Sequence, residues 1–448
     1  MHKSEIQNET ATDNKNYGMS LPSKDNLFIR MIQSIFSFEV LFILFLFAWV
    51  FKADPRFQWV PIDITELFFI LSLCIGILVF LGKKKRFNKK ATILALSGAA
   101  FAFYIFISLN WSAGHIYAVQ KTLHISTLTL WALFACAFII ASDTRRLNRF
   151  INLILAIAAW IALASALEYV KGGGGVINAL NSNYLALGYT LGMGLIISIA
   201  YVFFFEQSRS RRIALFIISL FFMFLLLVLG GRGPLIGVTI SLLIPLLYRA
   251  KVRLEYKLWI KKYFVFIVIL LIAVFSVSIY LYSKDSPTAT LARILLLFEP
   301  GMGTSVSTRV EYYLASYILW QFKPLLGHGI GSWPILIGLP DRISYPHNMV
   351  LEIIVELGLM GLILFGFILF WALKGFIHLK YNRSIFFTFV ILMMFINAFM
   401  GAMFSGDMND NRIIFALLGL MAFDEGKYEV NKGLKIVNLQ KRVRKNEK

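Results

Sequence analysis

The sequence predicts an all-α, polytopic integral membrane protein with about 12 transmembrane helices and one long external loop. Three observations predict this class: 58% of the 448 residues are hydrophobic, only 15% are charged, and the mean hydropathy is +0.73. Soluble domains carry roughly a quarter charged residues, so this chain has too few to cover a water-soluble surface. The apolar stretches also have the length that spans a bilayer core as a helix.

We expect helices at the hydrophobic stretches 35–51, 65–82, 91–109, 123–141, 150–170, 185–205, 213–229, 235–248, 263–283, 348–371, 385–404 and 412–423. Cys74 and Cys136 both lie inside such stretches. We interpret them as buried small hydrophobic residues, which predicts neither a disulfide nor a Cys-x-x-Cys metal site. The first 26 residues are polar, and hydrophobic residues dominate only from about Phe36. A cleavable signal peptide is therefore not expected.

The basic residues divide the loops into two sets. About 33 of the 44 Lys and Arg residues lie at the two termini and in alternate loops, and the positive-inside rule assigns these to the cytoplasm. The expected organisation is a cytoplasmic tail at 1–26, transmembrane helices within 27–283, a long external loop at 284–347, transmembrane helices within 348–423 and a basic cytoplasmic tail at 424–448. A formal net charge of +20 also suggests nucleic-acid binding. That alternative is disfavoured because the basic residues are dispersed among loops beside the membrane.

The external loop at 284–347 has a length that is typical of functional or disordered segments. It is rich in Trp, Tyr, Pro and Gly, which indicates a folded segment. We expect a helix from about Thr308 to Phe322 that lies on the membrane surface. The tetraglycine Gly172–Gly175 is interpreted as a flexible connection, because a phosphate-binding loop would need a helix N-terminus with polar partners directly after it.

Three ionisable residues on the external side are candidates for function, because charged groups at the boundary of an apolar bundle are costly. Arg232 lies in Gly-Gly-Arg-Gly-Pro at 230–234, between two apolar stretches. Arg309 lies near the start of the expected surface helix, where its charge opposes the helix dipole. His347 follows a Tyr-Pro pair where the long loop returns to the membrane. Structural explanations stay open for each: a snorkelling arginine, an ion pair with an acid elsewhere in the chain, and an interfacial histidine.

Two fixed positive charges and one titratable base on the same face suit a phosphorylated or diphosphorylated substrate. The planar guanidinium fork binds phosphate bidentately and can neutralise charge that develops on a phosphate leaving group. An imidazole with a reference pKa of about 6.5 can accept a proton from an attacking hydroxyl. His115, His124 and His328 are less well placed, and no His/Asp/Glu spacing predicts a metal site.

These motifs resemble the O-antigen ligase and O-antigen polymerase superfamily of bacterial membrane glycosyltransferases. The resemblance is strongest over 307–365, which contains a Ser-x-Arg helix start, Pro-Leu-Leu-Gly-x-Gly, His-Asn and, nine residues later, Gly-x-x-Gly. Upstream, Gly-Gly-Arg-Gly at 230–233 is similar to a turn of that family. The motif region covers about a third of the chain, and the order of the motifs is more specific than any one of them.

The resemblance implies a GT-C-like fold in a bacterial inner membrane, with both termini in the cytoplasm and the long loop and active site in the periplasm. It implies transfer of a glycan from undecaprenyl diphosphate to a hydroxyl acceptor, without a metal or another cofactor. Carried over residue by residue, Arg232 and Arg309 would bind the diphosphate and His347 would be the catalytic base of an inverting single displacement. Asp407 stands where family members often carry an acid. It would orient His347 or an acceptor hydroxyl, or cap the last helix.

The resemblance leaves the acceptor open. A ligase transfers the finished polymer to lipid A–core, whereas a polymerase transfers the growing chain to another lipid-linked repeat unit. We favour the ligase because the His-Asn and Gly-x-x-Gly motifs are complete. Enzymes that glycosylate proteins or build other surface polymers also fit.

Two alternatives come from other classes. A lipid-linked oligosaccharide transporter would tend to show two similar halves and charges near the midplane, and the sequence shows neither. A structural envelope protein would not need the three candidate residues. Besides the donor and the acceptor, the expected partners are membrane lipids, and no nucleic acid is expected.

Overall fold

The computed structural model describes residues 37–82, 88–172, 176–205, 207–247, 261–270, 288–296, 304–374 and 385–423, and the single positions 272, 276, 279, 280 and 376. Both expected cytoplasmic tails lie outside the described residues, as do glycines 173–175 of the tetraglycine. Parts of the expected helix at 263–283 and of the long loop are also outside them. The predictions for these segments stay predictions.

The described part of the chain is helical, with no strand. Eight helical segments are long and apolar enough to cross a membrane: Ile64–Leu81, Lys89–Trp111, Ile116–Ile140, Thr144–Lys171, Tyr184–Phe204, Arg209–Val228, Met349–Leu373 and Ile385–Ala402. Two shorter apolar helices are Phe38–Phe51 and Arg232–Leu247. The all-helical, polytopic class is thus confirmed, whereas the total of twelve spans stays a prediction.

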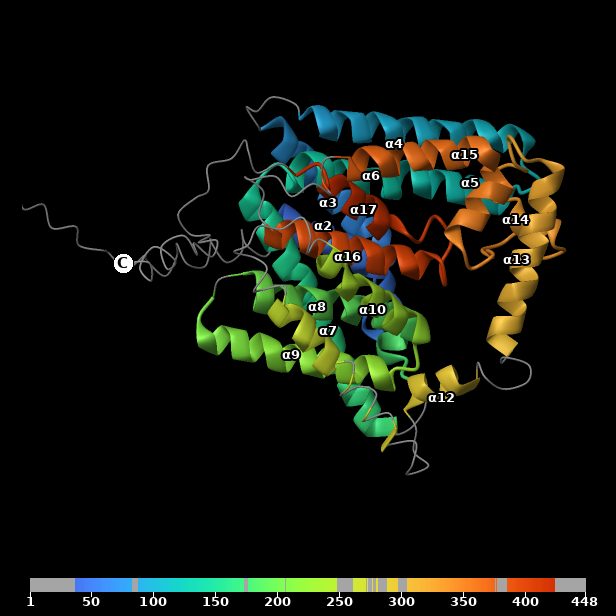
Figure 1. Cartoon of the computed structure of the whole chain (residues 1–448). Helices are drawn as coiled ribbons and strands as arrows, with labels where there is room; N and C mark the ends of the chain where they lie inside the picture. Colours follow the sequence, from blue (N-terminus) through green and yellow to red (C-terminus); the bar gives the residue numbers. More distant parts are fainter. Residues whose placement is uncertain are drawn as a thin grey trace, which may run out of the picture. The chain divides into compact units, whose positions relative to one another are not determined.

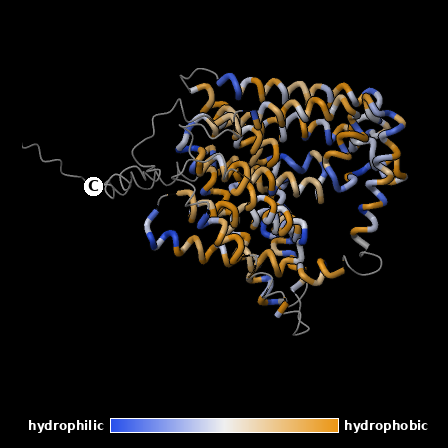
Figure 2. Tube along the Cα trace, viewed as in Figure 1, coloured by the Kyte–Doolittle hydropathy of each residue, from blue (hydrophilic) through white to orange (hydrophobic). Residues whose placement is uncertain are grey.

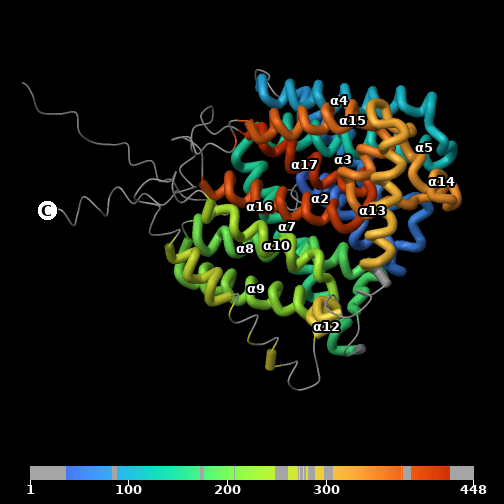
Figure 3. The backbone as a smooth tube through the Cα atoms, turned by 45° about the vertical axis from the view of Figure 1, so that its right-hand side comes forward, coloured from blue at the N-terminus to red at the C-terminus, as the bar shows by residue number. Residues whose placement is uncertain are grey.

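The long elements lie side by side with similar axis directions (Figure 1). They are α2 (Phe38–Phe51), α3 (Ile64–Leu81), α4 (Lys89–Ser108), α5 (Ile116–His124) with α6 (Leu130–Phe134), α7 (Thr144–Gly172), α8 (Tyr184–Phe204), α9 (Arg209–Val228), α10 (Arg232–Leu247), α15 (Met349–Leu373), α16 (Ile385–Ala402) and α17 (Arg412–Leu420). Between α10 and α15 the described chain forms a helical segment at 261–270, the short α12 (Ala289–Leu295), the longer α13 (Thr304–Phe322) and the short α14 (Trp333–Leu336). The helix expected from 308 to 322 is therefore present as α13. It runs across the ends of the long helices in both views (Figures 1 and 3).

The long helices are hydrophobic along most of their length, and hydrophilic residues gather toward their ends (Figure 2). Large apolar side chains are exposed on the outer faces of several of them, among them Leu78, Phe103, Leu167, Ile217 and Phe367. Exposed apolar surface on this scale is costly in water. It is what lipid-facing helices require.

Helix α8 is the most buried of the candidate membrane spans, because 94% of its apolar 18-residue stretch is buried inside the protein. A Cβ added at Gly188 would lie 2.7 Å from Cγ of Pro234, and one added at Gly192 would lie 2.6 Å from Cγ2 of Val238. Small residues at this spacing let helices approach closely within a membrane. The close contact between α8 and α10 fixes the N-terminal end of α10, where Arg232 lies.

The long loop is joined to α15 at a break in that helix. Gly358 has φ 64° and ψ −164°, and a Cβ at this position would lie 2.3 Å from the carbonyl oxygen of Leu325. Four backbone hydrogen bonds of 2.8 to 3.1 Å connect segment 324–329 with segment 355–360. The hydroxyl of Tyr104 donates to the carbonyl oxygen of Leu357 at 3.0 Å. The Gly-x-Gly motif at 327–329 and the Gly-x-x-Gly motif at 358–361 therefore lie against each other. Their backbones approach so closely that a Cβ at Gly327 or Gly358 would overlap the other segment.

Candidate functional site

The turn from Gly230 to Arg232, between α9 and α10, is held by helix α12. Gly230 has φ 91°, a conformation that glycine adopts readily. Its N–H donates to Oγ1 of Thr290 at 2.9 Å, and its carbonyl oxygen accepts from Nη1 of Arg293 at 3.1 Å. In return, Nη1 of Arg232 donates to the carbonyl oxygen of Arg293 at 3.0 Å. A backbone carbonyl thus holds Arg232 in place, and its positive charge is left uncompensated by this contact.

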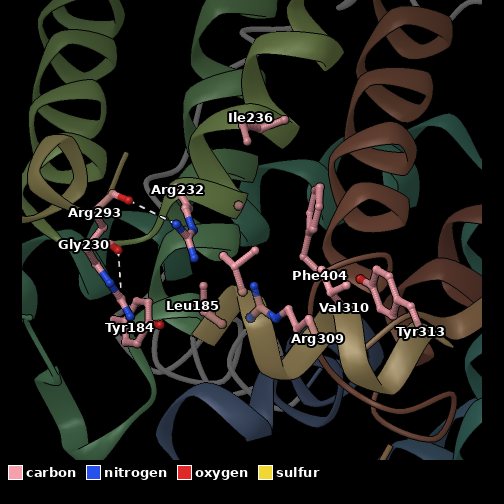
Figure 4. A pocket seen from close by; sticks show the side chains of 12 residues that line it. Tyr184, Leu185, Gly230, Arg232, Ile236, Arg293, Arg309, Val310, Tyr313 and Phe404 are labelled. Carbon is pink, nitrogen blue, oxygen red and sulfur yellow. Dashed lines mark hydrogen bonds between the residues drawn. The ribbon is translucent and has the colours of Figure 1, made fainter. Parts of the chain in front are cut away.

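A cavity of about 240 Å³ lies beside this turn. It is lined by Tyr184, Leu185, Gly230, Arg232, Gly233, Ile236, Arg293, Val306, Arg309, Val310, Tyr313 and Phe404. Among the described residues, this lining includes three arginines and no acidic residue. Figure 4 shows the side chains of Arg232 and Arg309 extending toward the same space from α10 and α13. Among the described residues, none of the three arginines forms an ion pair with a carboxylate. The cavity is therefore positively charged.

One face of α13 connects the cavity to His347. Tyr312 and Tyr313 lie three and four residues after Arg309, which puts both tyrosines on the same side of the helix as Arg309. Arg309 and Tyr313 line the cavity. The ring of Tyr312 is nearly parallel to the imidazole of His347, with an interplanar angle of 5° and centroids 6.4 Å apart. The structure thus brings together the three candidates that the sequence places far apart.

The backbone of His347 adopts a left-handed conformation, with φ 58°. Such a conformation is uncommon for a residue with a side chain, and it persists where the surroundings hold it. The hydroxyl of Tyr313 donates to the carbonyl oxygen of His347 at 3.4 Å and to that of Met403 at 3.2 Å. The ring of Tyr345 packs edge-on against the imidazole, with centroids 4.7 Å apart. Three tyrosines therefore fix where this histidine points.

The imidazole of His347 is held in its neutral form, which is the form that can accept a proton, although a lowered pKa also makes it a weaker base. Burial, and then the positive charge of Arg309, lower the pKa of His347 from 6.5 to about 4. Its buried Nδ1 has no hydrogen-bond partner among the described residues. At neutral pH the ring is therefore uncharged.

Asp407 adds, after burial and the charge of Asp410, to the causes that raise the pKa of Tyr345, but it forms its side-chain hydrogen bonds outside this group of residues. Its side chain is 1% exposed, its Oδ2 accepts from the hydroxyl of Tyr117, and its Oδ1 accepts from the N–H of Asp410 at 2.8 Å. Both carboxylate oxygens are thus occupied by protein donors. In the described structure Asp407 holds the segment that leads into α17, and its hydrogen bonds do not reach His347.

A buried charged cluster next to Asp407 was not identified from the sequence. Lys121 of α5 and Glu352 and Glu356 of α15 are fully buried. The ammonium group of Lys121 donates to Oε1 of Glu352 and to Oε2 of Glu356. The second oxygen of Glu352 accepts the N–H of Met408 at 2.9 Å. A signal for it existed, because two acidic residues one helical turn apart within an apolar stretch require a buried partner.

Two of the three other histidines that the sequence offered, His328 and His124, make ordinary structural contacts through their rings. Nε2 of His328 lies 2.8 Å from the carbonyl oxygen of Leu319, and Nδ1 of His124 lies 3.0 Å from the amide of Asn409. Within the described ranges, no group of three or more His, Cys, Asp or Glu residues is arranged to hold a metal ion. Arg293 was missed because nothing in the sequence indicates that α12 folds against the Gly230 turn.

Fold and site together define a polytopic helical membrane protein with an arginine-lined cavity and a neutral histidine next to it. Residues 214–366 match the family model described as O-antigen ligase, about a third of the chain. This match supports the O-antigen ligase and polymerase family that the motifs indicated. It includes Arg232, Arg293, Arg309 and His347, whereas Asp407 lies outside it. A comparison with curated proteins found no match.

Proposed function

We propose that this protein is a glycosyltransferase that moves a glycan from undecaprenyl diphosphate to a hydroxyl acceptor at the periplasmic face of the inner membrane. The acceptor that we favour is lipid A–core, which makes the protein an O-antigen ligase, in line with the description of the matching family. The observation that supports this most is the cavity in which Arg232 and Arg309 face one space that no described carboxylate lines. Neutral His347 lies against the same side of α13.

In this proposal the two arginines bind the diphosphate of the donor. Each guanidinium offers a planar pair of donors that matches two phosphate oxygens. When the bond between the anomeric carbon and the diphosphate oxygen breaks, the electron pair stays on that oxygen. Positive groups already in place stabilise this charge without reorganising. The apolar cavity wall formed by Leu185, Ile236 and Phe404 is compatible with the start of a polyprenyl chain.

His347 supplies the base. Its neutral imidazole accepts the proton of the acceptor hydroxyl while the hydroxyl oxygen bonds to the anomeric carbon. The two bond changes occur on opposite faces of that carbon, so its configuration inverts and no covalent enzyme intermediate forms. Asp407 acts indirectly in this scheme, because it is buried and its contacts fix the 405–411 segment.

An O-antigen polymerase would use the same diphosphate site and the same base. The acceptor alone distinguishes it from a ligase, because a polymerase receives a second lipid-linked repeat unit in place of lipid A–core. Both activities lie within the family that the match supports.

A deletion strain separates the two. Long polymer that stays on undecaprenyl diphosphate while lipid A–core remains bare identifies a ligase. Loss of long chains, with single repeat units still joined to the core, identifies a polymerase. In a second experiment the purified protein receives the donor lipid and each acceptor in turn. Absence of product with both acceptors, from protein that binds the donor, would contradict glycosyl transfer and favour a transporter.

A further inference from the structure

The cavity contains one more guanidinium group than the proposed function has used. Arg232, Arg293 and Arg309 all line it, and all three are half-buried. Like charges in a partly buried space repel one another, and this repulsion persists unless an anion is bound. Three cations with no carboxylate beside them among the described lining residues therefore indicate a ligand with more than one negative charge.

The side chain of Arg293 is held in a defined position. Nη1 donates to the carbonyl oxygen of Gly230 at 3.1 Å, and Cζ lies 4.7 Å from the ring centre of Tyr184. A guanidinium has five N–H donors, and the others have no protein acceptor among the described residues. Stacking on an aromatic ring orients the group without neutralising its charge. Arg293 thus offers a fixed positive charge with free donors at the cavity wall (Figure 4).

The charge of the proposed donor changes during the reaction. A diphosphate esterified at both ends carries two negative charges. Once the glycan has left, the terminal phosphate is no longer esterified, and its freed oxygen adds a further negative charge near neutral pH. The charges of two arginines balance the donor diphosphate, and a third arginine balances the extra negative charge of the diphosphate that is left after transfer.

We propose that Arg293 is a third diphosphate-binding residue, which makes the cavity selective for a lipid-linked diphosphate over a lipid monophosphate. This inference rests on the proposed function, because it assigns an additional residue to the same donor site. Arg293 also positions Arg232, but it does so through its backbone carbonyl oxygen. Replacing the side chain therefore removes the charge and keeps an acceptor for Arg232.

The test measures equilibrium binding to the purified full-length protein in lipid nanodiscs. The probes are undecaprenyl diphosphate, undecaprenyl phosphate and inorganic pyrophosphate. We expect the wild-type protein to prefer the lipid diphosphate over both others. Arg293→Gln should weaken binding of the lipid diphosphate about tenfold, as expected for loss of a charge-assisted hydrogen bond, and leave the monophosphate almost unchanged. Arg293→Lys should recover part of the preference, because it restores charge without the planar fork.

Two control variants separate a charge contact from a structural effect. Thr290→Val removes the hydroxyl that accepts the Gly230 N–H but removes no charge. It should therefore weaken binding of both lipids equally and keep the ratio of their affinities unchanged. Arg342→Gln removes an exposed charge of the long loop outside the cavity and should change the affinity for neither lipid. Thermal unfolding of each variant shows whether it is folded, and Arg293→Lys replaces Arg293→Gln if the latter is not.

The failures are distinguishable. If the wild-type protein prefers the diphosphate and Arg293→Gln keeps that preference, Arg293 is structural and this inference is wrong. If pyrophosphate binds as tightly as the lipid diphosphate, the selectivity for a lipid-linked ligand is wrong. If the wild-type protein binds neither lipid, the proposed function itself fails.

Discussion

Lys121 and Glu356 form an ion pair in which Nζ lies 2.7 Å from Oε2 and both side chains are completely buried. The same ammonium group also contacts Glu352, so one cation faces two carboxylates inside the helical core. The pair joins α5 to α15 directly before the break at Gly358. It thus fixes the helix that begins two residues after His347.

Lys121→Met should destabilise the protein by about 3–5 kcal/mol, because it leaves buried carboxylates without their counter-charge. Thermal unfolding in detergent measures the change. The matched control is Lys52→Met, whose ion pair with Asp63 at 3.2 Å is almost half exposed and should contribute less than about 1 kcal/mol. Equal effects of the two substitutions would show that the buried cluster does not stabilise the fold.

His347→Ala should abolish glycan transfer and leave the amount of protein in the membrane unchanged. Loss of a general base reduces the rate roughly 10²- to 10⁴-fold. The measurement is transfer by purified protein together with immunoblotting of membranes. His115→Ala is the comparison, because His115 is exposed on the loop before α5. Wild-type transfer by the His347 variant would rule out its role as the base.

Arg232→Lys and Arg309→Lys should each lower transfer at least about tenfold, because an ammonium cannot form the bidentate contact of a guanidinium with phosphate. Arg342→Lys, at an exposed position, should retain activity. Saturation with donor distinguishes weaker binding from slower chemistry. Full activity in both cavity variants would exclude them as diphosphate ligands.

The pKa of His347 predicts an unusual pH profile. The folded pKa of about 4 lies below the reference value of 6.5, so the base is neutral above about pH 4. The acid limb of kcat/KM should therefore lie near pH 4. The stability contributed by neutral His347 is complete above pH 6.5 and is lost as the pH falls toward 4.

Bound donor should shift this profile, because a diphosphate compensates the charge of Arg309 that helps to lower the pKa. The acid limb of kcat, which reports the complex, is then expected at higher pH than that of kcat/KM. Coincident limbs would indicate that the diphosphate does not reach Arg309.

Gly358→Ala should destabilise the protein by about 1–3 kcal/mol, because the residue has φ 64° and an added Cβ would overlap the carbonyl oxygen of Leu325. Gly366→Ala is a matched control in the same helix, since nothing lies within 4 Å of an added Cβ. It should be neutral or stabilising by up to about 1 kcal/mol. Gly358→Ala should therefore lower the unfolding temperature, whereas Gly366→Ala should leave it unchanged or raise it. Equal unfolding temperatures of the two variants would show that the break at Gly358 is dispensable.

The sequence by itself determined the class of protein and supplied most residues of the candidate site. Long apolar stretches have one stable form in lipid, so the helices and the all-α class follow from hydropathy alone. The glycine turn around Arg232, the helix that carries Arg309 and the His-Asn start of α15 are local patterns, and they too were predicted.

Only the tertiary structure decided which of these residues meet. Arg293 lines the cavity because α12 packs against a turn about sixty residues earlier in the chain. Lys121 forms its ion pairs with carboxylates of a helix more than two hundred residues later in the chain. Asp407, which the sequence suggested for the site, is occupied by Tyr117 and Asp410. Local sequence fixes the backbone of a helix, but contacts between distant segments depend on how small residues and buried charges let the helices pack.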